Sequence, residues 1–167
     1  MDPFEDVLAA NAHYAETFQD AGRPGKAAKG LAVITCMDSR ISPLEMLGLE
    51  PGDAKILRNA GARVTDDELR TLVLAAHLLD VSRVMVVAHT DCRMTKVTDD
   101  QVHEEILSQG VDTRSLEFRT MTDQRAELAH DVQKIRSSPY LPKNLVVAGC
   151  VYDVSSGRIE VVVPPTS

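Results

Sequence analysis

Aromatic residues are scarce in this 167-residue chain, which contains no tryptophan and only three phenylalanines and three tyrosines. An aliphatic core is therefore expected, and the scarcity argues against a ligand pocket lined by aromatic rings. Basic residues are also in the minority, since 18 Lys and Arg stand against 25 Asp and Glu and give a net charge of -7. Because this balance offers no basic surface to phosphate groups, we expect no nucleic-acid partner.

Long apolar runs are missing as well. No stretch approaches the roughly 20 apolar residues that span a bilayer, and the amino terminus, Met1-Asp-Pro-Phe-Glu-Asp, lacks the basic and apolar regions of a signal peptide. We therefore expect a soluble cytoplasmic protein with no membrane partner. Cysteine is limited to three residues, an odd number that does not suit a disulfide framework, and in a reducing cytosol metal binding is the better use for them.

The length suits a single domain, which we place at residues 1–167. Residues 1–19 carry apolar side chains at helical spacing, and with the Gly- and Pro-containing loop that follows they predict an N-terminal helical arm over residues 1–25. Such an amphipathic helix needs a surface to cover. Its own domain and a second subunit are both open as that surface.

Segments with a buried-strand pattern alternate with helical segments along the rest of the chain. The strand patterns cover residues 31–35, 54–58, 83–88 and 144–154, and the helical patterns cover residues 42–48, 65–79, 98–110 and 123–138. A turn at 155–157 leads into a last strand at 158–163, which would pair with its predecessor as a hairpin. The order predicts an α/β fold: a mostly parallel β-sheet with flanking helices, an antiparallel edge strand from the C-terminal hairpin, and the N-terminal amphipathic helix arm.

Polar side chains follow the first buried strand at alternate positions. Cys36, Asp38 and Arg40 come directly after Leu31-Ala-Val-Ile-Thr, and open α/β sheets place their binding crevices at the carboxyl ends of strands. If residues 36–40 remain extended, the two-residue period puts all three side chains on one side. We therefore predict that the thiol, the carboxylate and the guanidinium face a common site.

A second polar cluster follows the strand at 83–88. His89 and Cys92 are separated by two residues, a loop spacing that lets an imidazole and a thiolate converge on one ion. Together with Cys36 they make two thiolates and one imidazole, the ligand set expected for zinc. Because three protein ligands leave the fourth tetrahedral position for water or substrate, the pattern is typical of a catalytic rather than a structural site.

Other cysteine chemistries find no support in the sequence. Cys150 lies inside an apolar strand pattern and is expected to be a small buried hydrophobe. A phosphatase loop needs Arg six positions after its Cys, but position 42 is Ser, and neither a CxxC pair nor a phosphate-binding glycine loop occurs. His77 is ambiguous, whereas three histidines in charged helical stretches are expected to be solvated: His13, His103 and His130.

The two clusters, in this order, resemble the β-class carbonic anhydrases, in particular their small microbial branch. The residues that carry the resemblance are Cys36-x-Asp38-x-Arg40, His89-x2-Cys92, the Arg58-Asn-Ala-Gly61 turn, and Tyr152-Asp with Gly157 in the closing hairpin. The resemblance implies a Zn2+ enzyme that reversibly hydrates carbon dioxide to bicarbonate and a proton by zinc-bound hydroxide. It also implies that Asp38 and Arg40 form a catalytic dyad, and that the chain self-associates as a homodimer or larger assembly, often with the N-terminal helix laid across the partner.

The dyad also has a physical reading. Two thiolates cancel the charge of zinc, so the site should acidify bound water less than three neutral imidazoles would. Asp38 can help by accepting the water's proton in a hydrogen bond, but it could also take the fourth position and close the site. Arg40 can restrain it with a bidentate pair. We predict a switch in which Asp38 on Arg40 is active and Asp38 on zinc is inactive, with acid favouring the closed form.

Three points are left open by the sequence. Arg93 stands where the family commonly has Gly, and its side chain either covers the mouth of the site, where it could bind bicarbonate or narrow access, or points to solvent. The same scaffold could hydrolyse carbonyl sulfide or carbon disulfide instead. A non-catalytic zinc-binding dimer, with Asp38 closing the site, is the alternative from another class, although Arg40 would then have no purpose.

Overall fold

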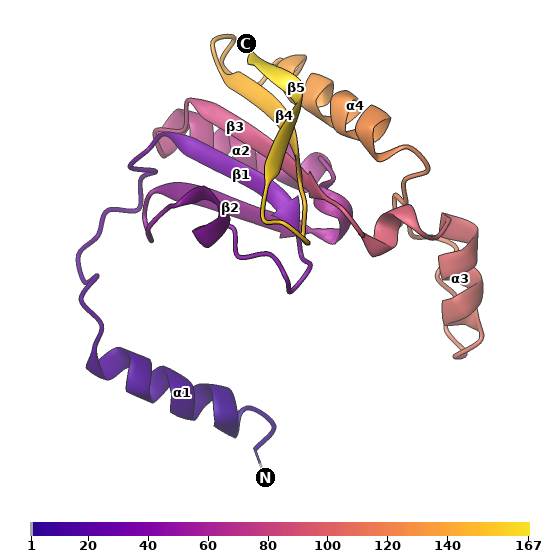
Figure 1. The fold of residues 1–167 in the computed structure, drawn as a ribbon, viewed down its shortest axis with the longest axis horizontal. Coiled ribbons are helices and arrows are strands. Elements are labelled where there is room, and N and C mark those ends of the chain that lie inside the picture. The colour runs from indigo at the N-terminus through magenta and orange to yellow at the C-terminus, as the bar shows by residue number, and fades with distance from the viewer. Residues whose placement is uncertain (1) are drawn as a thin grey trace.

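The computed structural model describes residues 2–167, so Met1, the first residue of the expected arm, lies outside the described part. A five-stranded sheet with the order β2-β1-β3-β4-β5 forms its centre (Figure 1). The strands are β1 (Leu31–Cys36), β2 (Ala54–Asn59), β3 (Arg83–His89), β4 (Val146–Tyr152) and β5 (Ile159–Thr166). Strands β1 to β4 pair in parallel, and β5 pairs with β4 antiparallel. The predicted fold class is therefore confirmed.

Two helices cover one face of this sheet. Helix α2 (Asp66–Leu78) forms within the predicted segment 65–79 and begins at a capping box between Thr65 and Glu68. Helix α4 (Gln124–Arg136) follows Asp123, whose carboxylate accepts two backbone N–H groups. Leu72 of α2 and Val132 of α4 are fully buried against the sheet. The alternate side chains of β1 and β3 complete this aliphatic core, which includes Ala32, Ile34, Val84, Val86 and Ala88.

Helix α3 (Asp99–Leu107) projects from the body beyond the end of β3 (Figure 1). It begins at a capping box of Thr98 and Gln101 and ends before Gly110, which has a φ of +86°. Asp99 accepts the backbone N–H groups of residues 118–120 and so ties the returning loop to the first turn of the helix. His103, predicted to be solvated, is half-buried beside Phe118.

The helix predicted from Ser42 to Gly48 is wrong. Only a 3-10 turn, η1 (Glu45–Leu47), forms there. Gly48 adopts a φ of +62° and its N–H binds the carbonyl of Glu45, which ends the segment after one turn. Only six residues, 42–47, lie between the predicted start and this glycine, too few to add the further turns that would favour an α-helix.

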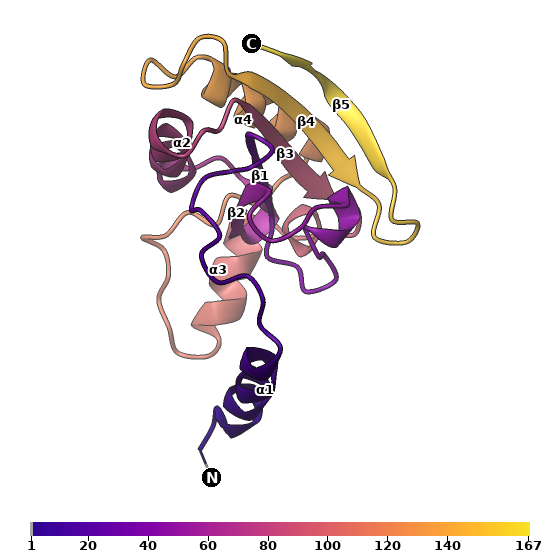
Figure 2. The ribbon, with the colours of Figure 1, turned by 90° about the vertical axis from the view of Figure 1, so that its left-hand side faces the viewer.

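The chain covers the second face of the sheet only in part, since Leu31, Val33 and Val87 are buried but Val161 of β5 is 55% exposed, and it leaves the first helix uncovered. Helix α1 (Glu5–Glu16) stands away from the sheet at the end of an extended linker (Figures 1 and 2), and none of its residues is buried. The predicted amphipathic helix is present, but it packs on no part of its own domain. Its large apolar side chains are exposed, together with two that flank it: Phe4, Val7, Leu8, Tyr14 and Phe18. Within residues 2–167 no helix is both long and apolar enough to cross a membrane.

Candidate metal centre

Three potential metal ligands meet at the carboxyl ends of β1 and β3. Cys36 ends β1, His89 ends β3, and Cys92 lies in the turn that follows. One ligand atom from each lies within 4.8 Å of the others, and all three side chains are buried. The two strands are neighbours in parallel, with Thr35 in register with Val87, so both polar clusters emerge at the same edge.

The donor set fits a zinc ion. Nδ1 of His89 lies 2.8 Å from the Thr90 carbonyl oxygen, an acceptor, so it carries the ring proton and Nε2 offers its lone pair to the cluster. Within the described residues, Nε2 of His89 is one of two buried side-chain polar atoms without a hydrogen-bond partner. A buried lone pair facing two sulfur atoms is the environment that a tetrahedral zinc ion satisfies.

The thiols of Cys36 and Cys92 have very different pKa values. A hydrogen bond from the Cys92 thiol, supported by His89 and the Gly61 N–H, lowers the pKa of Cys36 to about 3 although burial opposes ionisation. The adjacent Cys36 thiolate and burial raise the pKa of Cys92 well above its usual value. Burial disfavours a charged His89, but the Cys36 thiolate raises the pKa of that imidazole above its usual value.

Zinc binding to the metal-free protein is expected to release a pH-dependent number of protons. The metal needs both sulfurs as thiolates and a neutral imidazole, whereas Cys36 is already ionised and Cys92 still holds its proton. About one proton should leave per zinc once His89 is neutral, rising toward about two at lower pH. Calorimetric titration in buffers of different ionisation enthalpy measures this number. Release of two protons at a pH where His89 is neutral and the metal-bound water is not yet ionised would contradict the ionised state of Cys36.

The turn after β2, Arg58-Asn-Ala-Gly61, approaches the cluster closely. The Gly61 N–H donates to Sγ of Cys36 at 3.4 Å. Gly61 has a φ of +84°, so a side chain there would strain the backbone, and its Cβ would be crowded by Cε of Met121 at 3.0 Å and Cγ of Met94 at 3.2 Å. Arg58 binds the carbonyl oxygens of Cys36 and Asp38 and fixes the loop between them.

Asp38 and Arg40 come together, but not through an extended backbone. Strand β1 ends at Cys36, and Oδ1 of Asp38 accepts the backbone N–H of Arg40 at 2.9 Å in a turn. The expectation that residues 36–40 stay extended is therefore wrong, because a short Asp side chain offers the backbone a local alternative to the strand. The Arg40 guanidinium also donates two hydrogen bonds to the Asp38 carboxylate, from Nε to Oδ1 at 3.0 Å and from Nη2 to Oδ2 at 2.8 Å.

The Asp38 carboxylate lies beside the ligand cluster. Its Oδ2 is 3.9 Å from Nε2 of His89, and its side chain is 19% exposed. Hydrogen bonds from the Arg40 side chain and backbone hold the pKa of Asp38 well below its usual range. An ionised carboxylate is thus placed within reach of the position a metal would occupy, while both of its oxygens are engaged by Arg40.

Two charged residues at the site were missed from the sequence. Nη1 of Arg40 donates to Oδ2 of Asp91 at 2.8 Å, and Nζ of Lys96 binds the other Asp91 oxygen. Lys96 and then Arg40 lower the pKa of Asp91 to about 2. The available signal was the position of Asp91 inside the His89-x2-Cys92 loop, next to a ligand. Arg93, whose place was left open, points outward with 69% of its side chain exposed and pairs with Glu105 of α3 at 3.1 Å.

Comparison with known proteins agrees with this geometry. A sequence model described as carbonic anhydrase matches residues 31–159. β-Carbonic anhydrase 1 of Mycobacterium tuberculosis is 32% identical over 160 residues, covering 96% of this chain and 98% of that protein. A carbon disulfide hydrolase of Saccharolobus solfataricus is 31% identical over 154 residues, covering 78% of this chain and 76% of that protein. The crystal structure of carbonic anhydrase from Streptococcus mutans has a TM-score of 0.91 and 37% identity, covering 97% of this chain and 98% of that one.

Proposed function

Because the chain belongs to the β-carbonic anhydrase family, a family of zinc enzymes that hydrate carbon dioxide reversibly to bicarbonate and a proton, we propose that Cys36, His89 and Cys92 hold its zinc ion. The chain is thus a zinc-dependent lyase of the carbonic anhydrase type. The observation that carries the residue assignment is the buried cluster of two sulfurs and an unpartnered imidazole nitrogen.

Asp38 and Arg40 are the proposed catalytic dyad. Zinc bound to the three ligands supplies a Lewis acid that makes water nucleophilic near neutral pH. Oδ2 of Asp38 lies 3.9 Å from Nε2 of His89. From there Asp38 accepts a hydrogen bond from the reacting water and turns a lone pair of that water toward carbon dioxide. Arg40 keeps this carboxylate ionised and oriented, because both carboxylate oxygens accept from its guanidinium.

Stopped-flow measurement of carbon dioxide hydration, on zinc-loaded and chelator-treated protein, tests this function. We expect activity that depends on zinc and exceeds hydrolysis of carbonyl sulfide and carbon disulfide measured on the same sample. A carbon disulfide hydrolase is among the relatives, so preference for carbon disulfide would transfer the assignment to that reaction. The non-catalytic alternative predicts no turnover of any of the three substrates, and the engagement of Asp38 by Arg40 argues against it.

Replacement of Arg93 by Gly is expected to change the hydration rate by no more than about twofold. An exposed ion pair contributes little, and Arg93 faces Glu105 rather than the dyad. Arg93 does not have a left-handed φ, so the backbone does not require glycine at this position. Steady-state hydration at high and low carbon dioxide measures the effect. A fall in kcat/KM with unchanged kcat would instead place this guanidinium at the mouth of the site.

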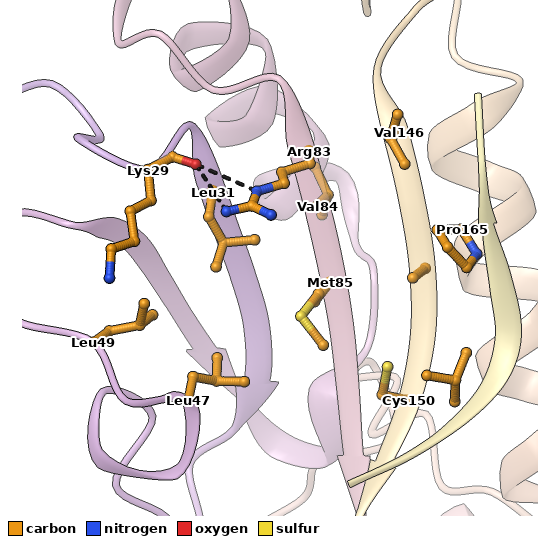
Figure 3. A pocket seen from close by; sticks show the side chains of 12 residues that line it. Lys29, Leu31, Leu47, Leu49, Arg83, Val84, Met85, Val146, Cys150 and Pro165 are labelled. Atoms are coloured by element: carbon orange, nitrogen blue, oxygen red, sulfur yellow. Dashed lines mark hydrogen bonds between the residues drawn. The ribbon is translucent and has the colours of Figure 1, made fainter.

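We propose further that the chain works as a homodimer or larger assembly and that a second copy covers the open face of the sheet. Figure 3 shows side chains of β1, β3, β4 and β5, together with Leu47 of η1 and Leu49 after it, around one hollow. The volume of this hollow is about 540 Å³. Parallel sheets bury both faces almost without exception, yet in this hollow Met85 of β3 is only partly buried and Val161 of the antiparallel edge strand β5 is 55% exposed. The two proposed contact surfaces are also opposite in charge. Helix α1, which the chain leaves uncovered, carries the acidic Glu5 and Asp6, whereas the basic Arg83 is among the residues that line the hollow.

Charge placed in this hollow or on the arm is expected to dissociate the assembly. Val161→Glu and Leu8→Glu should both shift the protein toward the monomer in sedimentation velocity, because each buries a carboxylate at the proposed contact. Leu74→Glu is the matched control, since Leu74 is 47% exposed on the outward side of α2. A wild-type monomer at micromolar concentration, or equal dissociation by the control, would contradict the proposed interface.

A cytoplasmic location is proposed on the chemistry of the same residues. All three cysteines are free and buried, and two of them must remain thiols to bind zinc. A reducing compartment keeps them in that state. Fractionation of cells that express the chain tests the location, and recovery outside the cytoplasm would contradict it.

A further inference from the structure

The turn that carries the second pair of ligands also carries a carboxylate to which the mechanism above gives no role. Asp91 lies between His89 and Cys92 and has a φ of +58°, a left-handed conformation that non-glycine residues adopt infrequently. Backbone conformations of this kind cluster at functional sites, where the surrounding contacts hold them in place. The contacts of Asp91 therefore indicate what this conformation is for.

The Arg40 guanidinium is held on two sides by two carboxylates. Nε and one Nη2 hydrogen face Asp38, whereas Nη1 donates to Oδ2 of Asp91 at 2.8 Å and Nη2 also reaches the Asp91 carbonyl oxygen at 3.2 Å. The two carboxylates bind different hydrogens, so they do not compete for the cation. Lys96 occupies the remaining oxygen of Asp91, and two negative charges are thereby matched by two positive ones.

Arg40 needs this second anchor because it is not buried. Its side chain is 45% exposed, and an exposed pair of two side chains contributes little against water. A metal ion beside Asp38 attracts the same carboxylate. A guanidinium fixed by Asp38 alone could follow that carboxylate or turn into solvent, whereas one fixed also by the Asp91 side chain and backbone keeps its plane and position.

We propose that Asp91, itself held by Lys96, is a positioning residue that locks the Arg40 guanidinium and thereby keeps Asp38 away from the fourth metal position. The inference rests on the proposed function, since it concerns the same zinc site. It links the two ligand-bearing strand ends: the turn after β3 controls the dyad that follows β1. Loss of this lock would leave the ligands in place and close the site with Asp38.

Asp91→Asn is the central test, because Asn tolerates a left-handed backbone and keeps the shape of the side chain while losing its charge. The readout is binding of thiocyanate to protein loaded with Co2+, followed by visible absorption at fixed pH. An exogenous anion needs the fourth position free, so we expect the dissociation constant to rise about tenfold in Asp91→Asn and less in Lys96→Met, with one metal bound per chain throughout.

Asp112→Asn is the matched control. The carboxylate of Asp112 accepts hydrogen bonds from the backbone N–H, Nε and Nη2 of Arg114, as Asp38 does from Arg40, but this pair lies away from the site. It should leave thiocyanate binding unchanged. Wild-type affinity in Asp91→Asn, loss of metal from that variant, or an equal effect of the control would each overturn the proposal. A wild-type protein that does not hydrate carbon dioxide, yet shows the selective loss in Asp91→Asn, would refute the proposed function and support the positioning of Arg40.

Discussion

Replacing Cys92 by Ser is expected to remove stoichiometric zinc and to lower carbon dioxide hydration at least ~100-fold. The proposed zinc site depends on soft thiolate ligands, whereas a serine hydroxyl does not ionise near neutral pH and is a weak ligand for zinc. The remaining Cys36 and His89 would supply only two ligands.

Cys150→Ala is the matched control for this experiment. Cys150 is also fully buried, but it lies on β4 among the aliphatic side chains Leu31, Val33 and Val87, and burial raises the pKa of its thiol. This variant should keep zinc and activity. Metal content per chain, hydration rate and thermal unfolding should be measured together, since a ligand variant that loses zinc while still folded separates metal binding from stability. Full zinc content in Cys92→Ser would refute the ligand assignment.

The sheet was predictable because its signals are local and strong. Residues 31–36 are buried without interruption, as expected of a central parallel strand, and the Thr65 and Glu68 pair satisfies backbone groups within one helical turn. The meeting of Cys36 with His89 and Cys92 was predictable for a topological reason. Neighbouring parallel strands deliver their carboxyl ends to one edge, so two polar clusters after two strands share a site.

The contacts around Arg40 could not be predicted in the same way. Its bond to Asp91 joins positions 51 residues apart, and a pattern based on short spacing does not detect it. The turn at Asp38 replaced the expected extended backbone because the carboxylate captures the Arg40 N–H, a choice between two local structures that sequence alone leaves balanced. Likewise, the helical spacing of residues 5–16 predicted a helix but could not show that α1 would find no surface on its own chain.

Replacing Arg40 by Met is expected to preserve zinc but to lower carbon dioxide hydration about 100-fold. The four N–H···O contacts of the guanidinium disappear, two of them to the Asp38 carboxylate. The freed Asp38, whose Oδ2 lies 3.9 Å from Nε2 of His89, can then turn an oxygen toward the metal. Arg40→Lys should recover little, because an ammonium group cannot form the planar fork that holds both oxygens.

The dyad also predicts a pH effect of known sign. Arg40 lowers the pKa of Asp38, so their pairing stabilises the folded protein fully above the ordinary carboxyl range near ~4 and is lost as the pH falls through the depressed folded-state value. Stability of the wild type should therefore fall more than that of Arg40→Met between about pH 5 and pH 2. Denaturant unfolding of both proteins in the metal-free state measures the difference. Parallel stability curves would show that the pair is not formed in solution.

A double variant distinguishes restraint by Arg40 from a direct role in the reaction. If Arg40 acts by holding Asp38, its removal matters only while Asp38 is present, and Asp38→Ala combined with Arg40→Met should hydrate carbon dioxide no more slowly than Asp38→Ala alone. If Arg40 contacts substrate itself, the two losses should multiply. The outcome is expected to be non-additive, because the guanidinium donates to Asp38 and to Asp91, and neither group is the reacting molecule.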